Sequence, residues 1–84
     1  MTAAQIRHLL GENIRNRRIA MRFTLRALGE AIGVSHARIS QIEHGDGRTP
    51  VDLLASLAEA LDTQPSILLT ANAFAAKKSL AHSA

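Results

Sequence analysis

The sequence of 84 residues lacks cysteine, tryptophan and tyrosine, and it contains only two phenylalanines and two prolines. Without cysteine the chain has no disulfide scaffold, no cysteine-type zinc site, no iron–sulfur cluster and no thiol nucleophile. No apolar run approaches the roughly 20 residues that cross a bilayer, and no signal-peptide pattern opens the chain. We therefore expect one small cytoplasmic domain, without a membrane segment, that folds by hydrophobic packing alone.

The apolar residues that are present favour helices. The chain has 15 Ala, 11 Leu and 7 Ile but only two Val, a composition with few of the β-branched and aromatic residues that fill strands. The charge is uneven, because residues 1–50 hold eight Arg against four acidic residues, whereas residues 51–84 hold two Lys against three. An all-α fold with an arginine-rich first half, suited to phosphates and guanine edges, is predicted.

Hydrophobic spacing predicts three helices in the first half. The first covers about residues 4–21, and its buried stripe is Ile6, Leu10, Ile14 and Met21. The second follows the capping side chain of Thr24 and ends at Gly33, and the third follows Ser35 and ends at Gly45. Both are short.

Two more helices are predicted after a loop that contains two glycines. Thr49 and Pro50 start the fourth helix, with proline at its first position, and Pro65 starts the fifth. The fourth helix buries Leu54, Leu57, Ala58 and Leu61. The domain is expected to cover residues 1–69. The alanine-rich segment 70–84 is interpreted as a frayed helix, a dimerisation segment or a disordered tail.

The second and third helices are spaced to form a helix-turn-helix. Gly29 is a small residue where two short helices approach each other, and Gly33 tolerates the left-handed conformation that the turn between them needs. Val34 and Ile39 fill the corner, and Ile42 anchors its far end. These positions together predict a three-dimensional motif rather than two unrelated amphipathic helices.

Residues 10–69 resemble the lambda-repressor-like, or Cro/CI-type (XRE family), DNA-binding domain. The resemblance rests on the motif Gly33-Val34-Ser35, Ile39-Ser40, Glu43 and Gly45, between a basic first helix and an apolar fourth helix. It implies a prokaryotic, phage or plasmid regulator of transcription, most often a repressor. It also implies that the regulator binds double-stranded DNA as a homodimer on a palindromic operator.

The third helix carries the candidate base-reading residues. With Ile39 and Ile42 assigned to the core, a helix that enters the major groove by its N-terminal end presents its first turn and the residue one turn later. Gln41 can bind adenine through two hydrogen bonds, Ala37 can meet a thymine methyl group, and His36 can donate to guanine. Arg38 is expected to contact a guanine or a phosphate. His36, Ala37 and Gln41 match the base-reading positions of the family.

The resemblance also implies a set of phosphate contacts. These flank the third helix and fix its register on the DNA backbone. They are Thr24, Arg26, Ser35, Ser40 and Arg48. Two residues depart from the family pattern, since Leu25 stands where glutamine is common and Asp46 stands where a cation is common. Both departures predict weaker binding to the DNA backbone, or a need for a second half-site.

Three further residues have expected structural roles. In the family, the positions of Arg18 and Glu43 form a largely buried salt bridge that ties the first helix to the third. Arg22 stands where glycine often ends the first helix in a left-handed conformation. Either Arg22 accepts that conformation, with an added phosphate contact, or the first helix ends differently.

Partners are predicted from the end of the chain. Ile67, Leu68, Leu69 and Phe74 are the candidate homodimer interface. A different class of function on the same fold is an antitoxin or adaptor that binds a protein partner, for which Phe74, Leu80 and the Lys77-Lys78 pair form a candidate segment.

Catalysis and metal binding have no support in the pattern. His36, His44 and Glu43 suggest no third ligand for a zinc ion, and no phosphate-binding or dinucleotide fingerprint occurs. The sequence predicts no enzyme activity, no cofactor and no metal.

Overall fold

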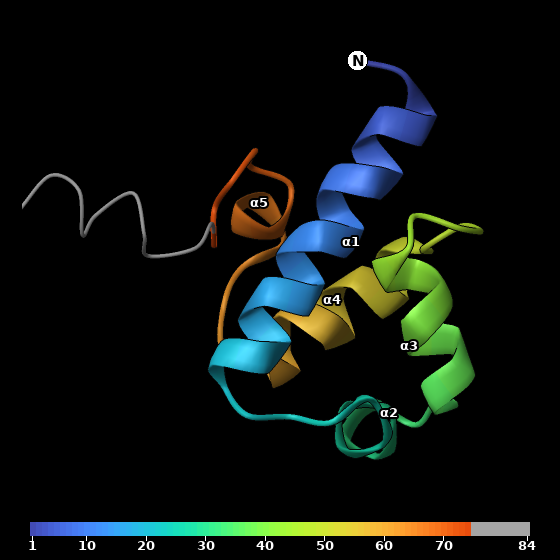
Figure 1. Cartoon of the computed structure of the whole chain (residues 1–84), viewed down its shortest axis with the longest axis vertical. Helices are drawn as coiled ribbons and strands as arrows, with labels where there is room; N and C mark the ends of the chain where they lie inside the picture. Colours follow the sequence, from blue (N-terminus) through green and yellow to red (C-terminus); the bar gives the residue numbers. More distant parts are fainter. Residues whose placement is uncertain (75–84) are drawn as a thin grey trace, which may run out of the picture.

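The chain folds into five helices in a computed structural model that describes residues 1–74, and α1 runs through the middle of the molecule (Figure 1). The helices α2 and α3 meet at one end, α4 crosses behind α1, and α5 lies on the opposite side of α1 from α3 (Figure 1). The predicted all-α fold is confirmed. The bounds are α1 (Ala3–Ala20), α2 (Leu25–Ile32), α3 (His36–Glu43), α4 (Val51–Ala60) and α5 (Pro65–Leu68).

The first helix begins at a capping box. The Thr2 hydroxyl accepts a hydrogen bond from the Gln5 amide at 3.1 Å, and the Gln5 side chain accepts one from the Thr2 amide at 2.8 Å. The predicted stripe of α1 is correct for Leu10 and Ile14, which are buried, but wrong for Ile6, which is 40% exposed. The spacing of Ile6 is helical, but the first turns of α1 extend past the helices that would cover it (Figure 1).

The corner between α2 and α3 forms as its sequence predicts. Side-chain oxygens of Thr24 and Ser35 cap the two helices, and Gly33 adopts the left-handed conformation with φ +78°. A Cβ atom on Gly29 would lie 2.5 Å from the Val34 carbonyl oxygen. Only glycine lets the chain turn this tightly, and the turn fixes the angle at which α3 leaves α2.

The core lies where the five helices meet. It contains Leu28 from α2 and Ile39 and Ile42 from α3, with the remaining buried apolar side chains being Leu10, Ile14, Leu57, Ala58, Leu61 and Leu68. The expectation that Leu68 belongs to a dimer surface is therefore wrong, because this side chain is fully buried. A four-residue helix is too short for its hydrophobic spacing to show which residue faces inward.

The start of α4 also differs from the prediction. Pro50 is the N-cap residue, in an extended conformation, and not the first helical residue. Its carbonyl oxygen accepts a hydrogen bond from the Leu54 amide at 2.9 Å, and no side chain caps this helix, so Thr49 does not serve as the cap. Pro65 is the first residue of α5, as predicted.

The end of α1 resolves the alternative for Arg22. This residue has φ +63°, and the Phe23 and Arg22 amides donate to the carbonyl oxygens of Arg18 and Ile19, both at 3.0 Å. This is the hydrogen-bond pattern of a Schellman motif, in which glycine is usual at the left-handed position. Arg22 therefore takes the conformation that the family's glycine takes.

Two side chains of α1 hold the C-terminal ends of α4 and α5. Asn13 is buried, and its amide nitrogen donates to the Leu68 and Thr70 carbonyl oxygens, both at 2.8 Å. Arg17 donates from Nε to the Leu61 carbonyl oxygen at 2.8 Å and from Nη2 to that of the next residue at 3.2 Å. The Thr70 carbonyl oxygen also accepts from the Ala73 amide at 3.2 Å. The other three carbonyl groups, at the ends of α4 and α5, have no partner within a helix, so α1 supplies the bonds that these ends need.

The packed domain continues past the predicted boundary at residue 69. Residues 70–74 form turns, and the half-buried Phe74 ring packs against the core, with the Arg17 guanidinium carbon 5.4 Å from the ring centroid. The expectations for Lys77, Lys78 and Leu80 lie outside the described residues. Within residues 1–74, no helix is both long and apolar enough to span a membrane.

Candidate nucleic-acid interface

The outer face of α3 presents the three candidate base-reading residues. Ile39 and Ile42 are buried, and this orientation of the helix leaves His36, Ala37 and Gln41 exposed. His36 and Ala37 lie in the first turn, and Gln41 lies one turn further along. An exposed, polar, short helix held by two buried isoleucines can enter a groove without disturbing the core.

Arg38 is less available than the other three. Its side chain is half-buried, and Nη2 donates to the Arg48 carbonyl oxygen at 2.5 Å. Arg38 therefore braces the loop that follows α3. The proposed contact of Arg38 with DNA would have to be made by the remaining guanidinium N–H groups.

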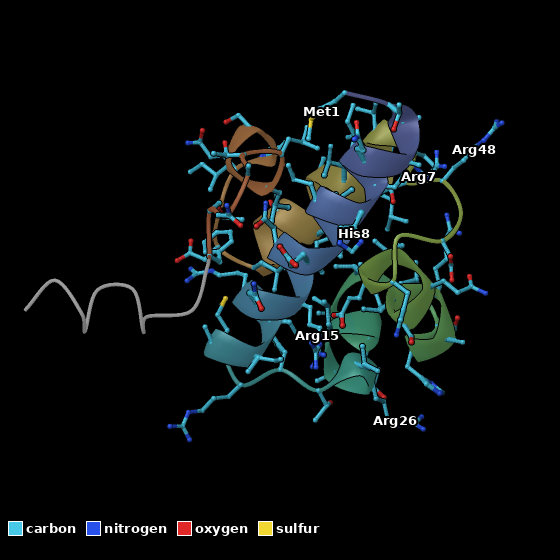
Figure 2. The ribbon with its side chains drawn as sticks, turned by 45° about the horizontal axis from the view of Figure 1, so that its top comes forward. Met1, Arg7, His8, Arg15, Arg26 and Arg48 are labelled. Carbon is cyan, nitrogen blue, oxygen red and sulfur yellow. The ribbon has the colours of Figure 1, made fainter. Side chains whose placement is uncertain are left out.

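The candidate phosphate-binding residues surround α3. The Thr24 and Ser35 hydroxyl oxygens accept hydrogen bonds from the Ala27 and Arg38 amides at 2.9 and 3.1 Å, so each hydroxyl keeps its hydrogen for donation. The exposed Arg26 and Arg48 appear at the two ends of the side on which α3 lies (Figure 2). Ser40 is half-buried on α3 itself.

The salt bridge between Arg18 and Glu43 fixes α3 against α1. The Arg18 Nε and Nη2 atoms lie 2.5 and 3.1 Å from the two Glu43 carboxylate oxygens, and Nη1 donates to the Phe23 carbonyl oxygen at 2.9 Å. The two side chains are only 12% and 4% exposed. A guanidinium with three such bonds holds the C-terminal end of α3 in one position.

A close backbone contact reinforces this arrangement. A Cβ atom on Gly11 of α1 would collide with the Ile42 carbonyl oxygen and lie 2.6 Å from that of Glu43. The helices α1 and α3 can approach this closely only because Gly11 has no side chain. Gly11 has no role among the predictions made from the sequence.

Four more residues beside α3 were also missed. Arg7, His8 and Arg15 lie along α1 (Figure 2), and His44 is the C-cap residue of α3. The available signal was the spacing of Arg7, Gly11 and Arg15 at intervals of four, which puts two cations and the glycine on one side of α1. Among residues 1–74, no group of three or more His, Asp or Glu side chains could hold a metal ion.

Comparison with known proteins decides the family. Residues 14–68, well over half of the chain, match the family described as Helix-turn-helix. The chain belongs to this helix-turn-helix family. The resemblance stated from the sequence is thereby confirmed, and the match covers the α2–α3 corner and the helices that support it.

Two curated relatives of this helix-turn-helix protein are regulators. It is 37% identical over 60 residues to the HTH-type transcriptional regulator DicA of Escherichia coli, covering 71% of this chain and 44% of the relative. It is 39% identical over 61 residues to Repressor protein C2 of Salmonella phage P22, covering 73% of this chain and 28% of the relative. The chain thus spans less than half the length of either relative.

Two solved structures share the fold. The clp gene regulator ClgR of Corynebacterium glutamicum is 36% identical, with a TM-score of 0.74 over 76% of this chain and 82% of that one. The solution structure of the DNA-binding domain of the P22 C2 repressor is also 36% identical, with a TM-score of 0.71 over 75% of this chain and 83% of that one. At this identity the similarity extends beyond the fold to the family.

Proposed function

We propose that this helix-turn-helix protein regulates transcription, as a repressor, by binding one double-stranded DNA sequence as a homodimer on a two-fold symmetric site. The observation that carries the proposal is the outer face of α3, where His36, Ala37 and Gln41 are exposed while Ile39 and Ile42 are buried. The names of the curated relatives and structural neighbours, which are regulators and repressors, support the same activity.

Each exposed side chain has a matching base edge. The Gln41 amide can bind N6 and N7 of adenine, the Ala37 methyl group can contact the methyl group of thymine, and the His36 ring can donate to N7 or O6 of guanine. The candidate phosphate-binding residues at Thr24, Arg26, Ser35, Ser40 and Arg48 supply affinity that does not depend on sequence. Specificity comes from α3, and the phosphate contacts fix its register.

The dimer is proposed to form through α5. Ile67 and Leu69 are each 41% exposed and lie on either side of the buried Leu68. The net charge of the chain is only +3, so one domain can make few phosphate contacts. A second half-site supplies the affinity that a single domain lacks.

The deciding experiment selects duplexes from a randomised pool at physiological salt and sequences those that the purified protein retains. Two half-sites about one helical turn apart are expected, in two-fold symmetric order. Retained DNA without any common sequence would refute base reading. If no DNA is retained, the proposal fails, and the antitoxin or adaptor function becomes the better account.

The dimer surface is tested separately. Ile67→Glu and Leu69→Glu should both convert the protein to a monomer in sedimentation at micromolar concentration, because each buries a carboxylate in the interface. Ile19→Glu is the matched control, since Ile19 is 51% exposed near the C-terminal end of α1, and this end lies away from α5 (Figure 1). A monomeric unaltered protein, both free and on DNA, would refute the dimer.

A further inference from the structure

A hollow of about 470 Å³ lies beside the exposed face of α3, between α1 and α3. His8 and Arg15 line it from α1, Ser40 and His44 line it from α3, and Leu25 lines it from the first turn of α2. His8, Arg15 and His44 are exposed to solvent. The hollow therefore opens to solvent between three helices, and the exposed part of its wall carries two histidines and Arg15.

The charges of its wall cancel while the histidines are neutral. Two acidic residues, Glu12 and Glu43, and two arginines, Arg15 and Arg18, line the hollow. Arg18 is already paired with Glu43, which leaves Arg15 opposed by Glu12. The hollow therefore becomes net positive only when a histidine takes up a proton.

One of the two histidines has a defined tautomer. The His44 Nδ1 atom lies 2.7 Å from the Ser40 carbonyl oxygen. A carbonyl oxygen only accepts, so Nδ1 carries the hydrogen and Nε2 of the neutral ring has none. The His44 Nε2 atom can donate a hydrogen bond only after protonation, and a bound anion favours that protonated form.

Resting on the proposed function, we propose that this hollow binds a phosphate of the DNA backbone, through the Arg15 guanidinium, the Ser40 hydroxyl and the protonated His44 ring. Binding takes one proton from solution onto His44 Nε2. The DNA then contacts α1 as well as the helix-turn-helix, and its affinity rises as pH falls.

The position of the hollow fits a phosphate track. Ser40 directly precedes the base-reading candidate Gln41, and Leu25 directly follows the phosphate-binding candidate Thr24. The backbone of His8 lies against the loop after α3, because a Cβ atom on Gly45 would be 3.2 Å from the His8 Cα atom. A DNA strand that contacts Thr24 and Ser40 thus passes the mouth of the hollow.

A purely structural role for His44 makes a different prediction. In that case His44 only ends α3, through the bond from its Nδ1 atom to the Ser40 carbonyl oxygen. His44→Gln would then lower the free energy of unfolding and leave the pH profile of DNA binding unchanged. Binding and unfolding must therefore be measured on the same variants.

The test measures duplex affinity by fluorescence anisotropy at constant ionic strength between about pH 5.5 and about pH 7.5, with the fold checked by circular dichroism. The duplex is the one recovered in the selection experiment. We expect the unaltered protein to bind up to about tenfold more tightly at the lower pH, and His44→Gln to lose this dependence. His8→Gln is the control for the other histidine of the hollow and should keep it.

A second measurement tests Arg15. Arg15→Gln should reduce the slope of log affinity against log salt by about one. Arg15→Lys keeps the charge at the same position and should leave the slope unchanged. An unchanged pH profile in His44→Gln, or equal slopes in the two arginine variants, would overturn the site while leaving the proposed function intact.

Inorganic phosphate separates the possible sources of the anion. The His44 ring signals are followed by nuclear magnetic resonance. Inorganic phosphate at millimolar concentration should shift these signals little, whereas the duplex should shift them clearly. Saturation by phosphate alone, with no effect of the duplex, would overturn the assignment to DNA. A protein that binds no duplex at any pH would refute the proposed function itself, and the DNA assignment with it.

Discussion

Replacement of Glu43 by alanine should destabilise the fold before it affects DNA recognition. The change removes both acceptors of Arg18, whose side chain is 12% exposed, and leaves the guanidinium with only the Phe23 carbonyl oxygen as a partner. Breaking a buried pair in this way costs about 3–5 kcal/mol. A domain of this length has a free energy of unfolding of only about 4–13 kcal/mol, so the loss is a large fraction of the total.

Thermal and urea unfolding followed by circular dichroism would measure this loss. At about 4–8 °C per kcal/mol, the melting temperature should fall by at least about 12 °C, and Glu30→Ala on the exposed face of α2 serves as the control. The double variant Arg18→Met with Glu43→Leu should recover much of the loss, because it leaves no unpaired buried charge. A Glu43→Ala protein that melts like the unaltered one would refute the reasoning.

Five other substitutions test four separate features. Gly11→Ala should lower the free energy of unfolding by about 1–3 kcal/mol, because the added methyl group meets carbonyl oxygens of α3. Gly33→Ala, at a left-handed residue with open space around it, should lower it by about 1 kcal/mol. An equal loss for both variants would count against the close contact at Gly11. Asn13→Ala should lower the free energy of unfolding by about 1–3 kcal/mol and speed amide exchange around α5, because the buried Leu68 carbonyl oxygen loses its partner and that of Thr70 keeps only the Ala73 amide. Arg22→Gly should raise the free energy of unfolding by up to about 1 kcal/mol, and a decrease would show that its side chain stabilises the fold. Gln41→Ala should relax selection at one base pair by about 1–3 kcal/mol while leaving the melting temperature unchanged.

Local features of this fold could be predicted from the sequence, and features that join distant segments could not. The α2–α3 corner depends on capping residues and glycines that lie next to the bonds they make, so Thr24, Gly33 and Ser35 indicated it directly. The partners of Asn13 and Arg17 lie 44 to 57 residues further along the chain. Carbonyl groups carry no sequence signal, because every residue has one.

The errors have the same origin. Ile6 has the spacing of a buried residue, but burial also needs a neighbour, and no periodicity reports where the other helices end. Leu68 was misassigned because three consecutive apolar residues on a single turn can be divided between core and surface in several ways. The candidate interface was predictable because buried Ile39 and Ile42 fix which way α3 turns, whereas the hollow at Arg15 and His44 forms only when α1 packs on α3.

The contacts of α1 with the ends of α4 and α5 limit the order in which the protein can fold during its synthesis. The α2–α3 corner is complete once Glu43 has been added, yet Asn13 bonds to the carbonyl oxygens of Leu68 and Thr70. At about 5–20 residues per second, a growing chain waits roughly one to five seconds between these two points. A fragment that contains every base-reading candidate but stops before Thr70 therefore has the residues for recognition without a rigid frame to present them.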